Sequence, residues 1–219
     1  MAGQGASNLA AWLAAYSLNE AGHNIDLLAE VGLYGYQPKP ASPFIFEFNN
    51  LLSSTAIIDS ITSLGALLRK TKSLGILGAG QIDQFGNINS TRVESFVLFG
   101  SGGANDAGSY AREIIVLIPL KAGRFPDKVP YITVPGGNVT ICVTTDAIFE
   151  KNEDGVFVLT GYFGDVTIEE QILDKIRDII SWDLEIKQPL IQFKAPSSNW
   201  LYFLRSFDPE RYFLGRLGT

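Results

Sequence analysis

The sequence predicts an α/β fold with an open, mixed and largely parallel sheet flanked by helices. Apolar, strand-like runs end in turns or glycine-rich loops near residues 32, 78 and 100. Segments with helical periodicity lie between these runs, and strands that alternate with helices favour parallel pairing. Residues 138–163 alternate apolar runs with the hairpin signal NEDG at 152–155, which predicts an antiparallel part of the sheet.

Two segments have the clearest helical pattern. Residues 7–21 repeat apolar side chains at three-to-four spacing and begin with Ser7 or Asn8, either of which can cap a helix. Residues 167–182 begin with Thr167, which opens a capping box, and repeat isoleucines on one face. Both segments are therefore expected to pack one apolar face on the sheet.

Shorter elements complete the prediction. We expect a helix near residues 60–70, and a helix or turn at the start of 109–120 that becomes a strand. Residues 36–50 hold three prolines and are expected to be a loop, with a short strand at 44–48 as an addition to it. The other strand-like runs are 25–32, 54–59, 74–80, 93–100, 129–133, 138–150, 155–163 and 184–193. No internal repeat or low-complexity linker interrupts them. Residues 1–219 are therefore expected to form one domain, in which residues from about 185 onward make an aromatic, loop-like packing tail.

The composition limits the function classes. The chain has 219 residues, 46% of them hydrophobic, which is enough to bury a full core. Its net charge of −6 argues against nucleic acid and anionic membranes as partners. The single cysteine, Cys142, excludes an internal disulfide and suits a reducing compartment. With no basic leader and no apolar run of about 20 residues, a cytoplasmic protein is expected.

Several chemistries lack the residues that they need. His23 is the only histidine and Cys142 the only cysteine, so the usual zinc ligand sets are missing and no metal site is expected. A serine nucleophile elbow of the form G-x-S-x-G does not occur, and neither does a Walker motif. These patterns argue against zinc, serine-hydrolase and nucleotide-triphosphate chemistry.

Three glycine-containing segments follow apolar runs and stand out as candidate binding loops. They read AEVGLYG at 29–35, GAGQIDQFGNINST at 78–91 and GSGGAND at 100–106. In an α/β sheet, such loops present backbone N–H groups to a phosphate or an oxyanion. The alternative for GSGG is a flexible turn, and for Gly86-Asn87 a tight turn.

Glu30 is the strongest candidate for a reactive side chain. It ends an apolar run and precedes Gly32 and Gly35. Partial burial among apolar neighbours would desolvate its carboxylate and make it a better nucleophile. The alternative is an ordinary glutamate that forms a salt bridge at the end of a strand.

Together, GAGQIDQFGNINST, GSGGA and the E-x-G turn of Glu30, Val31 and Gly32 resemble the β subunit of the family I coenzyme A transferases, close to the glutaconate CoA-transferase type. RFPDKVPYITVPG is similar to the central crossover of that family, and VTTDAIFE followed by GYFGDVTIEEQI is similar to its late strand, hairpin and C-terminal helix. The resemblance therefore covers nearly the whole chain. Val31 departs from the serine or asparagine of many relatives. The chain also begins at Met1, where relatives carry roughly one more helix and strand.

The resemblance implies a CoA-transferase or ribose-phosphate-isomerase-like sheet and an acyl-CoA substrate, with no permanently bound cofactor. It implies that Glu30 is a covalent nucleophile that forms an acyl anhydride and then a glutamyl-CoA thioester. It also implies an α-type partner subunit in an αβ or α2β2 assembly, the latter a heterotetramer, and a carboxylic acid as second substrate.

The resemblance further assigns backbone donors for the tetrahedral intermediates to Ala6, Gly102 and Gly103. The other residues implied to bind CoA or substrate are Gly78, Ala79, Gln81, Asn87, Asn89, Gly100, Ala104, Asn105 and Asp106. Asn105 and Asp106 have the alternative role of capping the helix that follows them. Lys121, Arg124 and Lys128 are expected either to meet the CoA phosphates or to form a solvated face.

Three functions remain open from the sequence. The first is transfer of CoA between carboxylic acids, with Tyr34, Phe44 and Phe46 expected in the acyl pocket. The second is a CoA-thioester or ring-opening hydrolase, or a decarboxylase, on the same scaffold. The third is a non-catalytic subunit that binds acyl-CoA. Retention of Glu30 favours the first.

Overall fold

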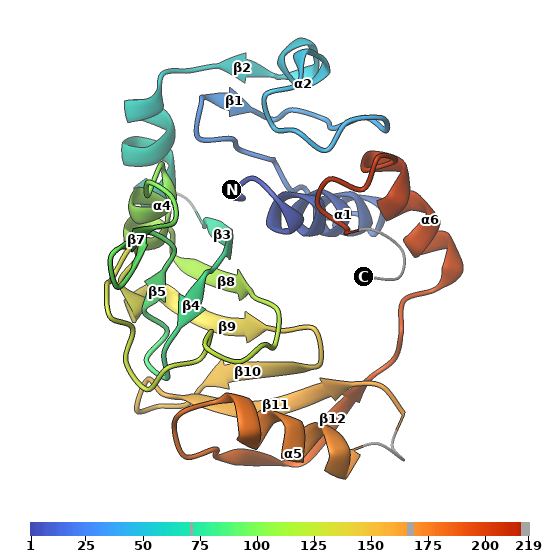
Figure 1. Ribbon diagram of the computed structural model, residues 1–219. Coiled ribbons are helices and arrows are strands. Elements are labelled where there is room, and N and C mark those ends of the chain that lie inside the picture. The colour runs from blue at the N-terminus through green and yellow to red at the C-terminus, as the bar shows by residue number, and fades with distance from the viewer. Residues whose placement is uncertain (71, 166–168, 216–219) are drawn as a thin grey trace.

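The computed structural model describes residues 1–70, 72–165 and 169–215 (Figure 1). Within these residues a six-stranded sheet has the order β12-β11-β10-β9-β8-β3. The strands are β3 (Leu74–Gly78), β8 (Glu113–Leu117), β9 (Val139–Val143), β10 (Ala147–Lys151), β11 (Phe157–Phe163) and β12 (Ile186–Phe193). The pairs β3–β8, β8–β9 and β11–β12 are parallel, whereas β10 is antiparallel to both of its neighbours. The predicted mixed, largely parallel sheet is confirmed.

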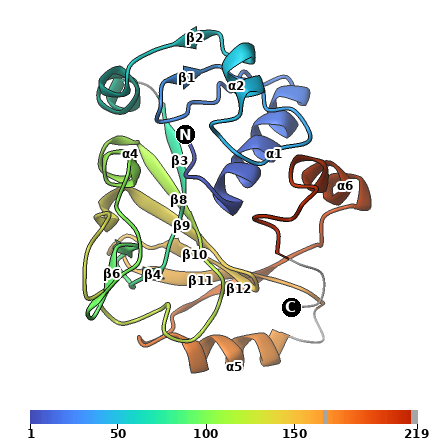
Figure 2. The same ribbon diagram turned by 45° about the horizontal axis from the view of Figure 1, so that its top comes forward.

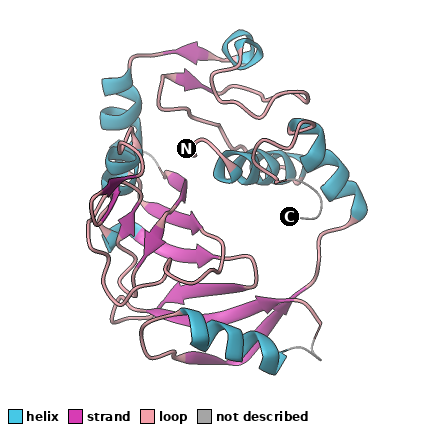
Figure 3. Cartoon of the chain, in the orientation of Figure 1, coloured by secondary structure: helices cyan, strands magenta, loops and turns pink. Residues whose placement is uncertain are grey.

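Helices flank the sheet (Figures 1 and 3). They are α1 (Ala6–Glu20), α2 (Phe48–Ser53), the π-helical η1 (Thr62–Leu67), α3 (Leu68–Lys70), α4 (Ala104–Tyr110), the 3₁₀ turn η2 (Gly136–Asn138), α5 (Glu169–Ile179) and α6 (Ser198–Phe207). Helix α5 lies beside β11 and β12, and α4 lies near β3 at the other side of the sheet (Figure 2). No helix in the described part of the chain is long and apolar enough to cross a bilayer.

Among the described residues, three two-stranded ribbons accompany the main sheet. They pair β1 (Leu33–Tyr34) with β2 (Ala56–Ile57), β4 (Gln81–Ile82) with β5 (Ile88–Asn89), and β6 (Arg92–Val93) with β7 (Phe96–Val97). The β4–β5 hairpin carries the first predicted glycine loop, and β7 leads into the second. The small ribbons therefore bring both loops to the β3 side of the sheet.

The main hydrophobic core joins the sheet to α5. Ile114 and Val116 of β8, Leu159 of β11 and Ile172 and Ile176 of α5 are all buried in it. The predicted apolar face of the late helix is thus correct, although its predicted cap, Thr167, lies outside the described residues. Burial of such a side chain stabilises a fold by about 1.5–3 kcal/mol.

A second buried cluster joins α1 to the β1 region and to α6. Trp12 is its largest member and packs against Phe207, with ring centroids 5.6 Å apart. Its indole Nε1 donates a hydrogen bond of 2.9 Å to the hydroxyl of Tyr36, which satisfies the buried polar atoms of both rings. The first helix was predicted correctly, but its N-cap is Gly5 rather than Ser7 or Asn8. The Asn8 side chain instead accepts a hydrogen bond from the Gly5 amide.

The prediction of a buried strand over 93–100 is wrong. Glu94 has a positive φ of 52°, and the chain turns there to form the short β6–β7 hairpin. Phe96, Val97 and Phe99 are more than 70% exposed in consequence. An apolar run in a sequence does not show whether other parts of the protein bury its side chains. Here the turn at Glu94 places these side chains in the β6–β7 hairpin and not in the main sheet.

Three shorter predictions are also wrong, and the loop predicted over 36–50 lacks the added strand at 44–48. Residues 25–32 form only an isolated bridge at Leu28. Residues 44–48 are a loop that leads into α2, and 129–133 form no strand. The segment after β12 is not loop-like, because α6 forms there with Ser197 as its N-cap.

Candidate active site

Glu30 lies on a tight turn that the sequence holds in place. The Gly32 amide donates to the Ala29 carbonyl at 2.9 Å, and the Ser63 hydroxyl donates to the same carbonyl at 3.1 Å. Gly32 has a φ of +94°, and a Cβ there would lie 1.7 Å from the carbonyl oxygen of Ile58. Only glycine fits this position, so the E-x-G pattern fixes where the Glu30 side chain begins.

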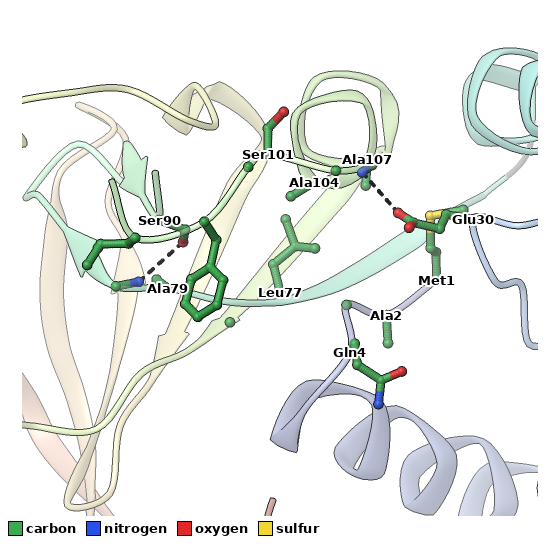
Figure 4. Close-up of a pocket in the computed structure, with 18 of the residues that line it drawn as sticks. Met1, Ala2, Gln4, Glu30, Leu77, Ala79, Ser90, Ser101, Ala104 and Ala107 are labelled. Atoms are coloured by element: carbon green, nitrogen blue, oxygen red, sulfur yellow. Dashed lines mark hydrogen bonds between the residues drawn. The ribbon is translucent and has the colours of Figure 1, made fainter. Parts of the chain in front are cut away.

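The second glycine loop meets this turn. The Gly103 amide donates a hydrogen bond of 3.0 Å to Oε2 of Glu30 (Figure 4). A Cβ on Gly103 would lie 2.1 Å from the same oxygen, so the contact depends on a residue without a side chain. Oε1 of Glu30 accepts no hydrogen bond from the described residues, and the half-buried carboxylate keeps one oxygen free to react.

Both features border one cavity of about 570 Å³. This volume is in the range of small-molecule sites. Seven of the residues that the resemblance assigned line it: Glu30, Gly78, Ala79, Gly100, Gly102, Gly103 and Ala104. The structure therefore brings together, from three distant segments, the carboxylate and the two glycine loops.

Three assigned polar residues of the first loop, Gln81, Asn87 and Asn89, do not line the cavity. Asn89 is fully buried, and its Nδ2 donates to the Oε1 of Gln81 at 2.9 Å. The Nε2 of Gln81 donates to the carbonyl of Gly123 at 2.9 Å. Asn87 donates to Asp83 and accepts from the Gly136 amide. These side chains hold the loop to its own neighbours in this structure.

Asp83 accepts several of the hydrogen bonds that hold the first loop in its conformation. Its buried carboxylate accepts hydrogen bonds from the amides of Phe85 at 3.1 Å and Asn87 at 2.9 Å. Lys151 donates from Nζ to the Gly136 carbonyl at 2.6 Å. Burial lowers the pKa of Lys151, and the nearby charge of Asp83 partly offsets this. The loop conformation is thus fixed by a buried polar network.

Three other assigned residues also lie outside the cavity lining. Ala6 is exposed at the first turn of α1, and the preceding residues Gly3 and Gln4 line the cavity instead. Asn105 donates from Nδ2 to the Thr133 carbonyl at 2.8 Å, and Asp106 lies in the first turn of α4. The predicted capping role of Asn105 and Asp106 is wrong, because the N-cap of α4 is Gly103 and no side chain of the described residues forms a cap hydrogen bond there.

The cavity also has lining residues that sequence reasoning missed. Among them are Gln4, Leu77, Ser90, Leu98, Phe99 and Ser101. Ser101 lies within the GSGG motif, so the motif itself was the available signal. The aromatic residues expected in an acyl pocket, Tyr34, Phe44 and Phe46, do not line it. Arg124 does, whereas its neighbours Lys121 and Lys128 are exposed outside the lining.

The described residues contain no group of three or more His, Cys, Asp or Glu side chains placed to hold a metal ion. The polar groups around the cavity include the Glu30 carboxylate, the Arg124 guanidinium, the Ser101 hydroxyl and backbone N–H groups. Such a set suits nucleophilic attack on a carbonyl carbon, with amide donors placed beside the carbonyl oxygen.

The fold is similar to that of solved CoA-transferase and decarboxylase structures. Glutaconate coenzyme A-transferase from Acidaminococcus fermentans superposes with a TM-score of 0.81 at 20% identity, over 98% of this chain and 90% of that one. The decarboxylase AibA/AibB gives a TM-score of 0.74 at 18% identity, over 100% of this chain and 90% of that one. At these identities the two matches establish the fold alone.

The sequence comparisons are more specific. The chain is 36% identical to the B-type subunit of glutaconate CoA-transferase from Acidaminococcus fermentans, over 68% of this chain and 62% of the relative. It is 27% identical to the B-type subunit of 3-oxoadipate CoA-transferase from Pseudomonas knackmussii, over 62% of this chain and 58% of the relative. The matches thus span about three fifths of these relatives' lengths. No protein-family model matches. Together, sequence and fold confirm the resemblance to the B-type subunits of CoA-transferases.

Proposed function

We propose that this chain is the β-type subunit of a CoA-transferase, and that it moves CoA between an acyl-CoA and a free carboxylic acid. The observation that carries the proposal is the Glu30 carboxylate on the wall of a cavity between two glycine loops, with one oxygen held by the Gly103 amide at 3.0 Å. The relatives that are B-type subunits of CoA-transferases support it.

In the first half-reaction, the free oxygen of Glu30 attacks the thioester carbonyl and expels the CoA thiolate. The product is an anhydride between the acyl group and Glu30. The thiolate then attacks the glutamyl carbonyl, which releases the first acid and leaves CoA on Glu30 as a thioester. An incoming carboxylate reverses these steps with a different acyl group, so that Glu30 ends as it began.

The Gly103 amide has a defined role in these steps. Whenever the glutamyl carbon is attacked, negative charge develops on the oxygen that remains bound to it. If Oε1 makes the covalent bond, Oε2 carries that charge and already lies 3.0 Å from the Gly103 amide. A donor positioned before the reaction needs no rearrangement at the moment when charge develops.

The names of the relatives bear on the assembly. Both names denote a B-type chain, so we propose that this protein works with an A-type subunit, as an αβ or α2β2 assembly. The open cavity on this chain is consistent with a site that a partner completes. Acyl-CoA is a substrate in this proposal, and no permanently bound cofactor is required.

Mass spectrometry tests the proposal directly. This chain, co-expressed with a candidate A-type subunit from the same genome, is incubated with a panel of acyl-CoAs without an acceptor acid. The expected result is a CoA-sized adduct on the peptide that contains Glu30. Absence of the adduct and of turnover across the panel would instead favour a subunit that only binds acyl-CoA.

Substitution of the nucleophile supplies the matching kinetic test. Glu30→Ala is expected to abolish both adduct and transfer. Glu30→Asp keeps the carboxylate but draws it back by about 1 Å, a displacement that can cost about 100-fold in rate. A Glu30→Ala protein that retains transfer activity would exclude Glu30 as the nucleophile.

The fold match to the decarboxylase AibA/AibB favours one second candidate, a decarboxylase or CoA-thioester hydrolase on the same scaffold. A hydrolase differs from a transferase only in that water attacks the glutamyl intermediate. Release of free acid or carbon dioxide from an acyl-CoA, with no exchange into an added acid, would support this candidate over transfer.

A further inference from the structure

Thr133 lies outside the cavity lining, but its side chain is attached to the first glycine loop. The side chain is 3% exposed. Its hydroxyl accepts a hydrogen bond of 2.9 Å from the Ser90 amide and donates one of 2.9 Å to the Thr91 hydroxyl. The backbone adds a contact, because the Thr133 amide donates to the Ile88 carbonyl at 2.8 Å. The end of the first glycine loop is therefore held by Thr133.

The same residue is attached to α4, the helix that follows the second glycine loop. The Thr133 carbonyl accepts a hydrogen bond of 2.8 Å from Nδ2 of Asn105. The next residue, Val134, is 1% exposed and packs against Gly108 of α4, where an added Cβ would lie 1.9 Å from its Cγ1. The segment around Thr133 therefore holds α4 in place, and with it the amide of Gly103 at the N-cap of this helix.

These contacts reach both sides of the cavity. On one side, the Ser90 hydroxyl accepts a hydrogen bond of 3.3 Å from the Gly80 amide, and both residues line the cavity. On the other side, the Gly103 amide donates to the Glu30 carboxylate. Ser90 and Glu30 lie on opposite sides of the site in Figure 4. Thr133 therefore connects the wall that faces the carboxylate to the helix that holds it.

We propose that Thr133 is a positioning residue for the proposed function, on which this inference rests. Its hydroxyl fixes the first glycine loop relative to Glu30, and thereby the width of the site that acyl-CoA enters. Valine at this position keeps the shape of threonine but leaves the Ser90 amide and the Thr91 hydroxyl without this partner, so the loop is released. The contact with Asn105 uses the backbone carbonyl and is retained, so α4 and its amide donor stay in place.

Three variants separate the hydroxyl of Thr133 from the packing around it. Thr133→Val removes the hydroxyl, whereas Thr133→Ser retains it and removes the methyl group. Thr160→Val is the matched control, because Thr160 is also 3% exposed and its hydroxyl donates to the Ile148 carbonyl within the sheet, outside the cavity lining. Each variant is co-expressed with the candidate A-type subunit. Steady-state kinetics use the acyl-CoA of the panel with the highest wild-type kcat/KM, and hydrogen exchange is followed by mass spectrometry on the ligand-free assembly.

Thr133→Val is expected to raise the KM for acyl-CoA about 5- to 30-fold, the effect of losing one to two hydrogen bonds, and to change kcat less than about threefold. Peptides that cover residues 80–91 should exchange faster, because the Ser90 amide loses its acceptor, and peptides that cover α4 should not. Thr133→Ser and Thr160→Val should keep KM within about twofold of the wild type. A loss of folded protein alone would instead lower the apparent kcat and leave KM unchanged.

Three results would overturn the inference. An unchanged KM in Thr133→Val would show that the hydroxyl does not set the site. A Thr133→Ser protein as impaired as Thr133→Val would assign the effect to packing of the methyl group, and an equal rise of KM in Thr160→Val would make it a general effect of losing a buried hydroxyl.

The proposed function is judged separately, by the Glu30 adduct. An adduct in the wild type, with no change of KM in Thr133→Val, rejects this inference alone. Hydrogen exchange needs no turnover, so unchanged exchange over residues 80–91 in Thr133→Val overturns the inference even where no adduct forms. Faster exchange over these residues without an adduct rejects only the transferase mechanism.

Discussion

At the scale of single residues, the contact between Gly103 and Glu30 is the most sensitive point of the site. Gly103 has φ −77° and ψ 1°, which alanine also adopts, so its backbone imposes no need for glycine. A Cβ there would nevertheless lie 2.1 Å from Oε2 of Glu30. The requirement for glycine at this position comes from the carboxylate and not from the local fold.

Gly103→Ala is therefore expected to lower transfer activity by at least about 100-fold while it leaves the fold intact, because the carboxylate must move by about 1 Å or more. Steady-state kinetics and thermal unfolding measure the two effects. Gly137→Ala is the matched control, since a Cβ on Gly137 meets no atom within 4 Å. Loss of activity together with a large loss of stability would show that Gly103 serves the fold instead.

At the scale of elements, the turn that carries Glu30 depends on Gly32. Its φ of +94° and the 1.7 Å approach to the Ile58 carbonyl both exclude a side chain. Gly32→Ala is expected to reduce the free energy of unfolding by about 1–3 kcal/mol or more, as strained positions do. Urea denaturation followed by circular dichroism measures this loss. A Gly32→Ala protein as stable as the wild type would mean that the turn rearranges freely, and the E-x-G pattern would then have no structural reason.

The helices and strands also show which structural features could be predicted from the sequence and which could not. Helix α1 and strands β3 and β11 were predicted because their patterns are local: spacing of three to four, or an unbroken apolar run. The run at 93–100 was misread because its exposure depends on the turn at Glu94, and a single sequence does not show what lies beside it. Helix α6 was missed because its aromatic residues pack on α1, a contact between distant segments.

In the candidate site, too, features set by local sequence were predicted, whereas contacts between distant segments were not. The motifs identified the glycines and Glu30 correctly as one cluster, because backbone geometry at glycine is a local requirement. Asn89 and Gln81 were assigned to ligands from the family resemblance of their loop, and the structure shows the Asn89 amide donating to Gln81. Arg124 gave no local signal that separated it from Lys121 and Lys128. The single-domain organisation, the cytoplasmic location and the roles of the site residues stay predictions.

At the scale of the whole molecule, the cooperativity of the sheet can be measured through its one cysteine. Cys142 lies in β9 at the centre of the sheet and is 1% exposed. Burial raises the pKa of its thiol far above the usual range, since a thiolate would be desolvated there. The thiol therefore ionises readily only after the sheet has opened.

The sign of the resulting pH dependence follows from proton binding. Above the unfolded-state pKa of about 8.5, the unfolded chain loses the thiol proton while the folded chain keeps it, so the unfolded state gains stability as pH rises. The thiol should therefore lower the free energy of unfolding by about 1.4 kcal/mol for each pH unit above that point. Cys142→Ala lacks this contribution, and subtracting its slope from that of the wild type removes the effects of tyrosines and lysines. Urea denaturation between about pH 8 and 10 measures both slopes. Equal slopes would mean that the thiol ionises within the folded protein, and thus that the centre of the sheet admits water without unfolding.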